Sequence, residues 1–293
     1  MDGNPKLGFI GLGVMGEPIC ANLAAKSGHL VIAYDSDPAR AARLAEKGVA
    51  AAGNADAVFE TADIVFLSLP SGEVVEKVLI DGGIIDRLRV GQTIVDLGTS
   101  SVDVTRRIAA LCAQRGAHFA DAPVARTRSA AIAGTLAVMV GSSAEMFERL
   151  SPLIATFATD ITHCGDVGAG QVVKILNNTI LFQIGVALSE AKAVGERAGV
   201  PSDRLFSALS KGSADSFALR NHGMKAMVPD VFPDNAFSVK YARKDLGYSL
   251  QLAAAQGLEV PSARHVDTVF AEAIAAGFGD LYWPVICRLF DPA

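Results

Sequence analysis

The sequence predicts an α/β protein with two domains, a doubly wound parallel sheet over residues 1–164 and an all-helical domain over residues 165–293 that begins with a long helix. Three features support this prediction. Short apolar runs alternate with helical stretches up to about residue 160, which is the rhythm of βαβ units. A glycine-rich turn directly follows the first apolar run. Beyond residue 170 the pattern is helical throughout.

The apolar runs of the first half have the composition of buried strands, and glycine or proline ends several elements. We expect strands at Leu7–Ile10, His29–Tyr34, Asp63–Pro70, Gln92–Leu97, Ala117–Asp121 and Leu136–Val140. Helices are expected after Gly16 and over Pro38–Lys47, Ser71–Leu79 and Val102–Arg115.

The second half begins with a predicted helix over Val172–Arg197, which contains no proline and would be about 40 Å long. This helix is apolar around most of its circumference, so it must be covered by its own domain, by the first domain or by a second subunit. Shorter helices are expected at Pro201–Ser210, Ser238–Gln256 and Pro261–Ala276.

Composition limits the class of protein. Of the 293 residues, 51% are hydrophobic and 19% charged, and the net charge of −5 includes no basic block, which argues against nucleic acid or an anionic membrane as partner. The uncharged, apolar stretch 175–189 is shorter than the ~20 residues of a membrane span. The first strand begins too early for a signal peptide, and the four cysteines are widely spaced, so we expect reduced thiols in a cytoplasmic protein. The histidine spacing predicts no metal site.

The turn after the first strand has the form G-x-G-x-x-G, with Gly11, Gly13 and Gly16, and opens a helix. This is the Rossmann-type dinucleotide fingerprint, in which backbone N–H groups and the helix N-terminus receive a diphosphate. Its predicted contacts include Leu12 and Met15. A purely structural glycine turn is the alternative, but a second feature supports the fingerprint.

That second feature is Asp35, which ends the second strand at the ~20-residue spacing expected of an acid that binds the adenosine ribose. A carboxylate there repels a 2′-phosphate, and the next few residues supply no cation. The sequence therefore favours NAD over NADP, although Arg40 and Arg43 lie one to two helical turns further on.

Three loops follow strands at the carboxyl edge of the predicted sheet, where ligands of such sheets bind. They contain Leu69-Pro70, Thr99-Ser100 and Asp121-Ala-Pro-Val124. Each could instead be ordinary turn chemistry at a strand end.

Within the long apolar helix, Lys174 and Asn178 are four residues apart and share one face. If the lysine is desolvated, the neutral amine that an acid/base lysine needs is favoured, and the amide can orient either the lysine or a substrate. The alternative is a lysine that extends into solvent from the start of a helix, with Asn178 bonded to a neighbouring carbonyl.

Five motifs are spread over nearly the whole chain. They are Gly8–Gly16, Asp121–Val124, Gly134-Thr-Leu, the G-x-x-x-K-x-x-N-N stretch Gly170–Asn178, and Lys244-Asp245-Leu246. In this order and spacing they resemble the β-hydroxyacid dehydrogenase family, which includes 3-hydroxyisobutyrate dehydrogenase, tartronate semialdehyde reductase and sulfolactaldehyde reductase.

The resemblance implies that Lys174 is the catalytic acid/base and that Asn178 is its partner, which also touches substrate. It implies that Thr99 and Lys244 lie against the nicotinamide half of the cofactor, with Leu69 and Pro70 on the adenosine side. It also implies a homodimer or homotetramer.

One loop departs from the family pattern. Where many members have D-x-P-V-S-G-G, this chain continues after Val124 with Ala125, Arg126, Thr127 and Arg128. An arginine offers a planar fork of donors to a carboxylate or sulfonate, and it resembles the arginine-bearing loop of sulfolactaldehyde reductases. We therefore expect Ala125, Arg126 and Thr127 to bind the anionic end of the substrate; the alternative is that Arg126 points to solvent. Gly98, where relatives often have Ser, and the aromatic Asp280–Pro284 segment are further departures.

The expected activity is hydride transfer between NAD, with NADP possible, and C3 of a small 3-hydroxy acid or its sulfonate analogue. A glyoxylate, succinic semialdehyde or tartronate semialdehyde reductase of the same fold is an alternative. An imine reductase is less favoured, because its relatives usually replace the lysine. A non-catalytic NAD-binding module would not need the lysine, the asparagine and the anion loop together.

Overall fold

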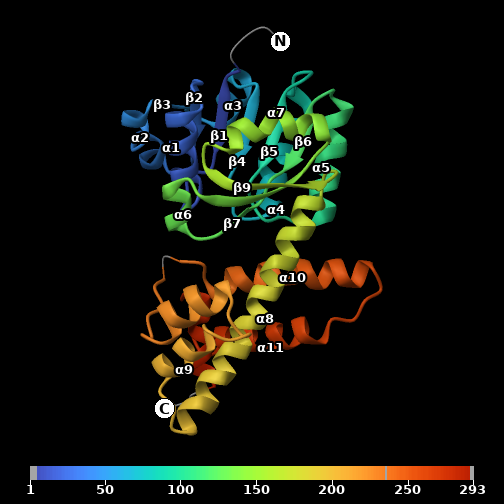
Figure 1. Ribbon diagram of the computed structural model, residues 1–293. Coiled ribbons are helices and arrows are strands. Elements are labelled where there is room, and N and C mark those ends of the chain that lie inside the picture. The colour runs from blue at the N-terminus through green and yellow to red at the C-terminus, as the bar shows by residue number, and fades with distance from the viewer. Residues whose placement is uncertain (1–4, 235, 291–293) are drawn as a thin grey trace. The chain divides into compact units, whose positions relative to one another are not determined.

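The computed structural model describes residues 5–234 and 236–290 and divides into two compact units, 1–174 and 175–293 (Figure 1). The first unit contains the sheet, and the second is helical. The division falls inside the long helix α8. The predicted combination of a parallel-sheet domain followed by a helical domain is confirmed.

The sheet of the N-terminal unit has nine strands within the described residues, in the order β3-β2-β1-β4-β5-β6-β8-β7, with β9 paired to β8. Strands β1 to β6 are parallel, whereas β8 runs antiparallel to β6 and β7. The strands are β1 (Leu7–Ile10), β2 (Val31–Tyr34), β3 (Val49–Ala51), β4 (Ile64–Leu67), β5 (Thr93–Asp96), β6 (His118–Asp121), β7 (Val124–Ala125), β8 (Leu136–Gly141) and β9 (Ala158–Gly165).

The strand order reverses direction between β1 and β4, so the crevice at the carboxyl ends of these strands is the place where such a sheet binds ligands. The α-helices of this unit are α1 (Gly16–Lys26), α2 (Pro38–Ala42), α3 (Ala55–Thr61), α4 (Gly72–Glu76), α5 (Val102–Gln114), α6 (Arg128–Ala133) and α7 (Ala144–Ile154).

Alternate strand residues enter two separate cores, because successive side chains of a strand point to opposite faces. Phe9 and Phe66 pack with residues of α1 and α7, whereas Val65 and Leu67 pack with residues of α3, α4 and α5. Both faces of the sheet are therefore covered by helices, as expected of strands that read as continuous apolar runs.

Side-chain caps explain where several helices begin. Asp37, Asn54, Ser101 and Ser143 each accept a hydrogen bond from a backbone N–H in the first turn of the helix that follows. These residue types are the preferred N-caps because they satisfy donors that have no partner within the helix.

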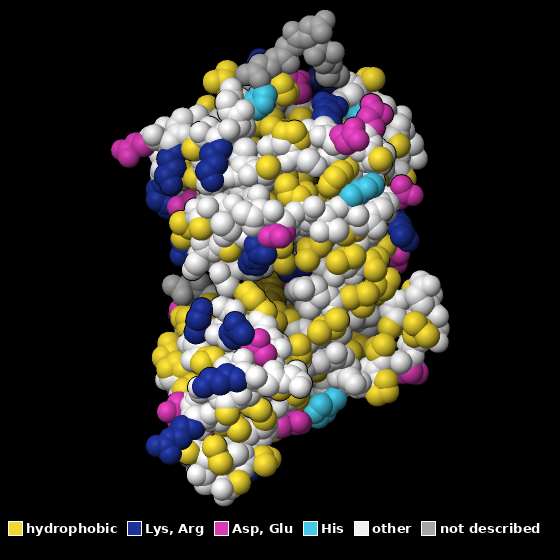
Figure 2. All heavy atoms as spheres, in the orientation of Figure 1, with side chains coloured by type: hydrophobic (Ala, Val, Ile, Leu, Met, Phe, Trp, Pro, Cys, Tyr) yellow, Lys and Arg dark blue, Asp and Glu magenta, His cyan; other side chains and the backbone are white. Residues whose placement is uncertain are grey.

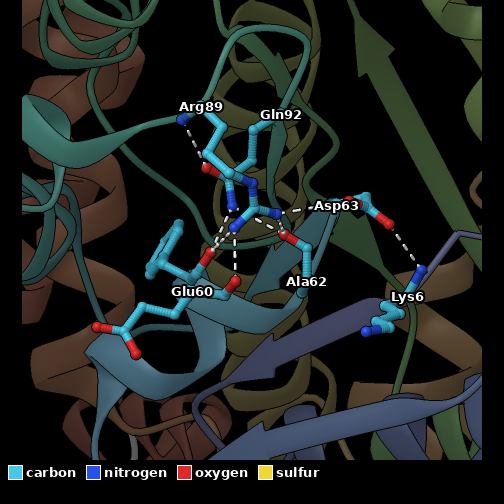
Figure 3. Close-up of polar contacts among 7 residues, drawn as sticks. Lys6, Glu60, Ala62, Asp63, Arg89 and Gln92 are labelled. Atoms are coloured by element: carbon cyan, nitrogen blue, oxygen red, sulfur yellow. Dashed lines mark hydrogen bonds and ion pairs between the residues drawn. The ribbon is translucent and has the colours of Figure 1, made fainter.

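Two side chains that come about 30 residues later in the sequence bind the C-terminal end of α3 (Figure 3). The guanidinium of Arg89 donates to the carbonyls of Phe59, Glu60 and Ala62, and the buried Gln92 donates to those of Phe59 and Ala62. Gln92 also accepts a hydrogen bond from the backbone N–H of Arg89. These two side chains therefore satisfy carbonyls that the helix end leaves without partners.

Predicted and observed elements differ mainly where the chain is irregular. The predicted helix Pro38–Lys47 is two pieces, α2 and a 3₁₀ turn at Ala45–Lys47. The predicted helix Ser71–Leu79 is α4 followed by a π-helical stretch, Lys77–Asp81. The sequence patterns did not predict β3, α3, β7, α6 or α7. The first four are short, and α7 contains a proline, Pro152, inside the helix.

The C-terminal unit is built on α8 (Ala169–Arg197), with α9 (Ser202–Leu209), α10 (Val239–Ala255) and α11 (Pro261–Ala275). A π-helical stretch at Leu219–Met227 and a 3₁₀ segment at Trp283–Leu289 complete it. At the centre of its core, the Phe182 ring makes edge contacts with the rings of Phe270 and Trp283.

By length and composition α8 could cross a membrane, with a mean hydropathy of 1.4 over 18 residues. However, 44% of that window is buried inside the structure, and Phe182 and Val186 belong to the core of the C-terminal unit. The core helix of a globular protein has the same composition. On the face shown in Figure 2, Lys and Arg side chains are interspersed with Asp, Glu and apolar ones.

Candidate active site

The glycine turn between β1 and α1 requires glycine at two positions. Gly11 has φ +94°, a backbone conformation that favours glycine, and its N–H donates to the carbonyl of Tyr34. A Cβ on Gly16 would lie 1.9 Å from the Gly11 carbonyl oxygen. At Gly13, by contrast, a Cβ would meet only the Arg40 guanidinium, at 3.7 Å, among the described residues. The turn is therefore tightly closed at its ends and open in the middle, where a diphosphate would approach.

Asp35 directly follows β2 and joins this turn to the next loop. Its carboxylate accepts hydrogen bonds from the backbone N–H of Leu12 at 2.6 Å and of Asp37 at 2.9 Å, and the residue is 9% exposed. The Arg40 guanidinium lies 3.7 Å from the same carboxylate. Met15 immediately precedes α1 and packs against the core. The structure thus brings Leu12 and Asp35 together at one end of the turn.

The loops after β4 and β5 lie side by side. A Cβ on Gly98 would be 2.9 Å from the Leu69 carbonyl oxygen, so the backbone of the Gly98-Thr99 segment runs close to that of Leu69-Pro70. The predicted cofactor residues Leu69, Pro70 and Thr99 therefore come from neighbouring strand ends. This close approach also gives a physical reason for glycine at position 98.

Asp121, at the end of β6, is fully buried and accepts hydrogen bonds from the N–H groups of Gly168 at 2.6 Å and Gln171 at 2.8 Å. Its carboxylate thus satisfies donors at the start of α8, as an acid at a helix N-terminus does. Burial raises the pKa of Asp121 to about 6, although these hydrogen bonds act in the opposite direction.

Lys174 and Asn178 lie one turn apart on α8. Lys174 is half-buried, and Asn178 is 3% exposed. The Asn178 amide donates to the Asp245 carboxylate at 2.9 Å and accepts a hydrogen bond from Asn177 at 3.2 Å. The carboxylate of Asp245 on α10 thus fixes the Asn178 amide.

Lys244 precedes Asp245 on α10, in the unit that also contains Asn178. Its ammonium lies 3.0 Å from the Asp245 carboxylate and 4.2 Å from the centre of the Tyr241 ring. Asp245 is 2% exposed and contacts both Asn178 and Lys244, so it orients two of the predicted site residues. Among the described residues, no group of three or more His, Cys, Asp and Glu is arranged to hold a metal ion.

Two family models match consecutive parts of the chain. Residues 6–165 match the NAD binding domain of 6-phosphogluconate dehydrogenase, and residues 168–284 match the NAD-binding domain of NADP-dependent 3-hydroxyisobutyrate dehydrogenase. The chain is 34% identical to a 2-(hydroxymethyl)glutarate dehydrogenase of Eubacterium barkeri, over 95% of this chain and 92% of that one. It is 35% identical to a 2-hydroxy-3-oxopropionate reductase of Escherichia coli, over 94% of each chain.

A solved structure of 3-hydroxyisobutyrate dehydrogenase from Mycobacterium tuberculosis, with L-serine, superposes with a TM-score of 0.88 at 32% identity, over 97% of this chain and 98% of that one. The chain belongs to the β-hydroxyacid dehydrogenase family. It is therefore an NAD(P)-dependent oxidoreductase that acts on CH–OH groups of hydroxy acids.

In this member of the β-hydroxyacid dehydrogenase family, the loop after β7 is unusual. Arg126 occupies the place of the first glycine in the family's S-G-G and has φ +86°, so the backbone keeps a conformation that suits glycine. Its guanidinium donates to the Thr135 carbonyl at 2.7 Å and to the Thr159 hydroxyl at 3.1 Å, and pairs with Asp160 at 2.8 Å.

Arg126 therefore has partners within its own unit and does not simply extend into solvent. Ala125 is held in β7 opposite Ala137, and Thr127 precedes α6 without capping it through its side chain. Binding of an anion by Arg126 stays a prediction, and it would require the guanidinium to exchange Asp160 or Thr159 for the ligand.

Sequence reasoning missed two residues of this β-hydroxyacid dehydrogenase site, Asp245 and Gln171. The Lys244-Asp245-Leu246 motif marked the position of Asp245 but not its contact with Asn178. Gln171 stands inside the G-x-x-x-K stretch as a variable residue, and no spacing rule points to its partners, Gly98 and Ser100.

Proposed function

We propose that this enzyme interconverts a small 3-hydroxy acid and its semialdehyde, with hydride transfer between C3 and NAD and with Lys174 as acid/base. One observation carries the proposal: Lys174 stands one helical turn before the Asn178–Asp245 pair, on a helix whose first turn is anchored to the strand ends of the dinucleotide fold. The 3-hydroxyisobutyrate dehydrogenase solved with L-serine, itself a 3-hydroxy acid, supports this substrate class.

In the oxidation direction, the neutral Lys174 amine accepts the hydroxyl proton while C3 gives its hydride to the oxidised nicotinamide. In reduction, the Lys174 ammonium protonates the oxygen as the carbonyl carbon receives hydride. Asn178, held by Asp245, orients the substrate oxygen or the lysine. Acid/base catalysis of this kind contributes about 10²–10⁴-fold in rate.

The anionic end of the substrate is proposed to bind the loop that contains Ala125, Arg126 and Thr127. A carboxylate and a sulfonate both suit a guanidinium. Reduction of 2-hydroxy-3-oxopropionate (tartronate semialdehyde) is the second candidate, because the relative from Escherichia coli carries that name. A substrate panel of 3-hydroxyisobutyrate, glycerate, 4-hydroxybutyrate and 3-sulfolactate separates these possibilities.

The proposed arrangement places the glycine turn (Gly11, Gly13, Gly16) at the diphosphate, Leu69 and Pro70 at the adenosine, and Thr99 and Lys244 at the nicotinamide. We also propose a cytoplasmic homodimer or homotetramer. Gel filtration with light scattering measures the assembly, and a monomer at working concentration would contradict it.

The acid/base assignment is tested by Lys174→Met, with Lys192→Met as the matched control on the same helix. Lys192 pairs with Glu196, four residues further on α8. We expect Lys174→Met to lower kcat by at least about 100-fold, with NAD affinity little changed, because the proton acceptor is lost. Lys192→Met should keep near-normal kcat. A folded, NAD-binding Lys174→Met enzyme with normal turnover would contradict the proposal.

The preference for NAD is proposed to depend on Asp35, because an acid at the end of the second strand of such a fold is expected to bind the adenosine ribose hydroxyls, and this residue is nearly buried. Asp35→Ser should raise the KM for NAD about tenfold, since hydrogen bonds to a charged group are lost, and should narrow the gap between NAD and NADP. Asp37→Ser removes a nearby exposed carboxylate and serves as the control. Equal effects of the two substitutions on the NAD/NADP ratio would show that Asp35 does not select the cofactor.

A further inference from the structure

We infer that Gln171 is a positioning residue, which fixes the loop that carries Thr99 against the first turn of α8 and thereby sets the location of Thr99 relative to Lys174. The inference rests on the proposed function, since it assigns a role to the distance between two proposed site residues. It concerns the side chain of Gln171, which the family motif G-x-x-x-K leaves unspecified.

The Gln171 amide binds the backbone on both sides of Thr99. Its oxygen accepts a hydrogen bond from the Ser100 N–H at 3.1 Å, and its nitrogen donates to the Gly98 carbonyl at 2.9 Å. The Gln171 residue is 0% exposed. A buried amide that uses both of its ends in this way fixes the peptide units around Thr99, because an unpaired buried polar group is costly.

A second buried side chain, on the strand β5, binds the same two residues, Gly98 and Ser100. Asp96, at the end of β5 and 1% exposed, accepts hydrogen bonds from the Gly98 N–H and the Ser100 hydroxyl, each at 2.9 Å. The loop is thus held between a strand end and a helix. Without Gln171 the contact with the strand end would remain, and the contact with α8 through this amide would be lost.

The helix side of the contact has little freedom to move. The backbone N–H of Gln171 itself donates to Asp121. A Cβ on Gly170 would lie 2.3 Å from the Met139 carbonyl oxygen, so the first turn of α8 lies directly against β8. Because this turn is fixed to the sheet, the Gln171 side chain holds the Gly98–Ser100 backbone at a fixed distance from the first turn of α8.

Lys174 is three residues after Gln171 and therefore neighbours it on the helix surface. One side chain thus connects the residue proposed to contact the nicotinamide with the helical turn that carries the proposed acid/base. Hydride transfer and proton transfer require the nicotinamide and the acid/base lysine to be correctly placed relative to the substrate. A misplacement of about 1 Å costs on the order of 100-fold in rate. Gln171 is therefore expected to influence kcat although it does not take part in the reaction.

The chain offers a matched control in Gln92. This glutamine is also buried, belongs to the same unit and bonds backbone groups through both ends of its amide, but at the end of α3 (Figure 3). Gln171→Met and Gln92→Met remove the same hydrogen-bonding capacity and keep a side chain of similar length. Both variants should lower the melting temperature. A positioning role is shown only if Gln171→Met lowers kcat and Gln92→Met does not.

We expect Gln171→Met to lower kcat about 10- to 100-fold with the best substrate of the panel, with the KM for NAD changed by less than about threefold. The primary isotope effect with NADH deuterated at C4 should increase, because hydride transfer becomes more rate-limiting. Gln92→Met should change neither quantity. If both variants lose similar thermal stability and kcat stays within about twofold of wild type for each, the inference is overturned.

Gln171→Glu gives a second readout that also serves if Gln171→Met does not fold. A protonated carboxyl can donate to the Gly98 carbonyl and accept from the Ser100 N–H, as the amide does, whereas a carboxylate cannot donate. The ratio of variant to wild-type kcat should therefore rise as the pH falls. Asp96 and Asp121, the other carboxyl groups of this network, are present in both proteins, and the wild-type pH profile records their titration. A ratio that does not change with pH would contradict the inference.

The same assay includes Lys174→Met, so failure of the proposed function can be distinguished from failure of the positioning role of Gln171. Full activity of Lys174→Met would refute the proposed function whatever Gln171 does. Loss of activity in Lys174→Met together with normal kcat in both Gln171 variants would refute the positioning role alone.

Discussion

At the scale of single residues, Arg126 combines a side chain with three polar partners and a backbone at φ +86°. A non-glycine residue in this region costs about 1 kcal/mol or more. The exposed ion pair with Asp160 returns little of that cost, because solvent screens the attraction between surface charges. The strain therefore raises the question of what the guanidinium contributes to function.

Arg126→Gly and Arg126→Ala separate the contribution of the side chain from that of the backbone. Both remove the guanidinium, but only glycine fits the positive φ without strain. If the guanidinium binds the substrate anion, both variants should raise the KM for the preferred substrate about tenfold or more, and equally, while Gly stabilises relative to Ala by about 1 kcal/mol. Initial rates on the substrate panel and thermal melts measure the two effects.

Retained KM in both variants would instead assign Arg126 to the support of its own loop, and the sulfonate hypothesis would lose its basis. A KM raised only by the alanine variant would show that backbone conformation matters and the charge does not. The family-level chemistry stands in either case, because it does not depend on Arg126.

Residues with a fixed sequence spacing were predictable, whereas residues defined by distant partners were not. Gly11, Gly16 and Asp35 were proposed from spacing alone, because one strand–helix–strand unit positions all three. Gln171 and Asp245 work through contacts with the loop after β5 and with α8, respectively, and only the folded chain brings these together. Arg126 was predictable as a departure from a pattern, but its partners Thr159 and Asp160 were not.

At the scale of elements, the start of α8 is anchored by a buried acid, and this gives a pH dependence. Burial raises the pKa of Asp121 from its ordinary 3.8 to about 6 in the folded protein. The folded state therefore binds this proton more tightly than the unfolded state does. The stabilisation is present below about pH 4 and is lost as the pH rises to about 6, by up to about 3 kcal/mol.

Asp121→Asn tests this contribution, because asparagine has a similar size and does not titrate. The difference in unfolding free energy between wild type and Asp121→Asn should fall as the pH rises from 4 to 6, measured by urea unfolding at each pH. The pKa of the nearby Cys164 is raised by burial and by the charge of Asp121, so that thiol stays neutral over this window. A constant difference over the window would show that the hydrogen bonds from Gly168 and Gln171 outweigh burial.

The helices and strands with strong hydrophobic periodicity were predicted correctly. The breaks within helices and the shortest strand were not. The strand cores and the helices α5, α8, α10 and α11 follow from long apolar patterns. The breaks after α2 and α4 depend on local 3₁₀ and π geometry, which hydrophobic spacing does not encode. The edge strand β7 contains two residues, too few to show alternation.

At the scale of the whole molecule, the chain contains separate cores in its two units, and α8 runs from one unit into the other. The predicted diphosphate and ribose contacts, from Gly11 to Asp35, belong entirely to the N-terminal unit. The predicted nicotinamide contacts do not, because Thr99 lies in the N-terminal unit and Lys244 in the C-terminal one. The effect of the cofactor on each unit therefore shows whether that unit contributes to cofactor binding.

Hydrogen exchange of the intact enzyme, with and without saturating NADH, is expected to show protection in both units. In the N-terminal unit, the turn after β1, the loop after β5 and the start of α8 should exchange more slowly, because binding to the folded state suppresses local opening. In the C-terminal unit, the change should be limited to the part of α10 around Lys244. ADP-ribose, which lacks the nicotinamide, serves as the control: it should protect the turn after β1 and leave α10 unchanged. Equal protection of α10 by both ligands, or none by NADH, would remove Lys244 from the proposed nicotinamide site and leave Thr99 as its remaining assigned contact.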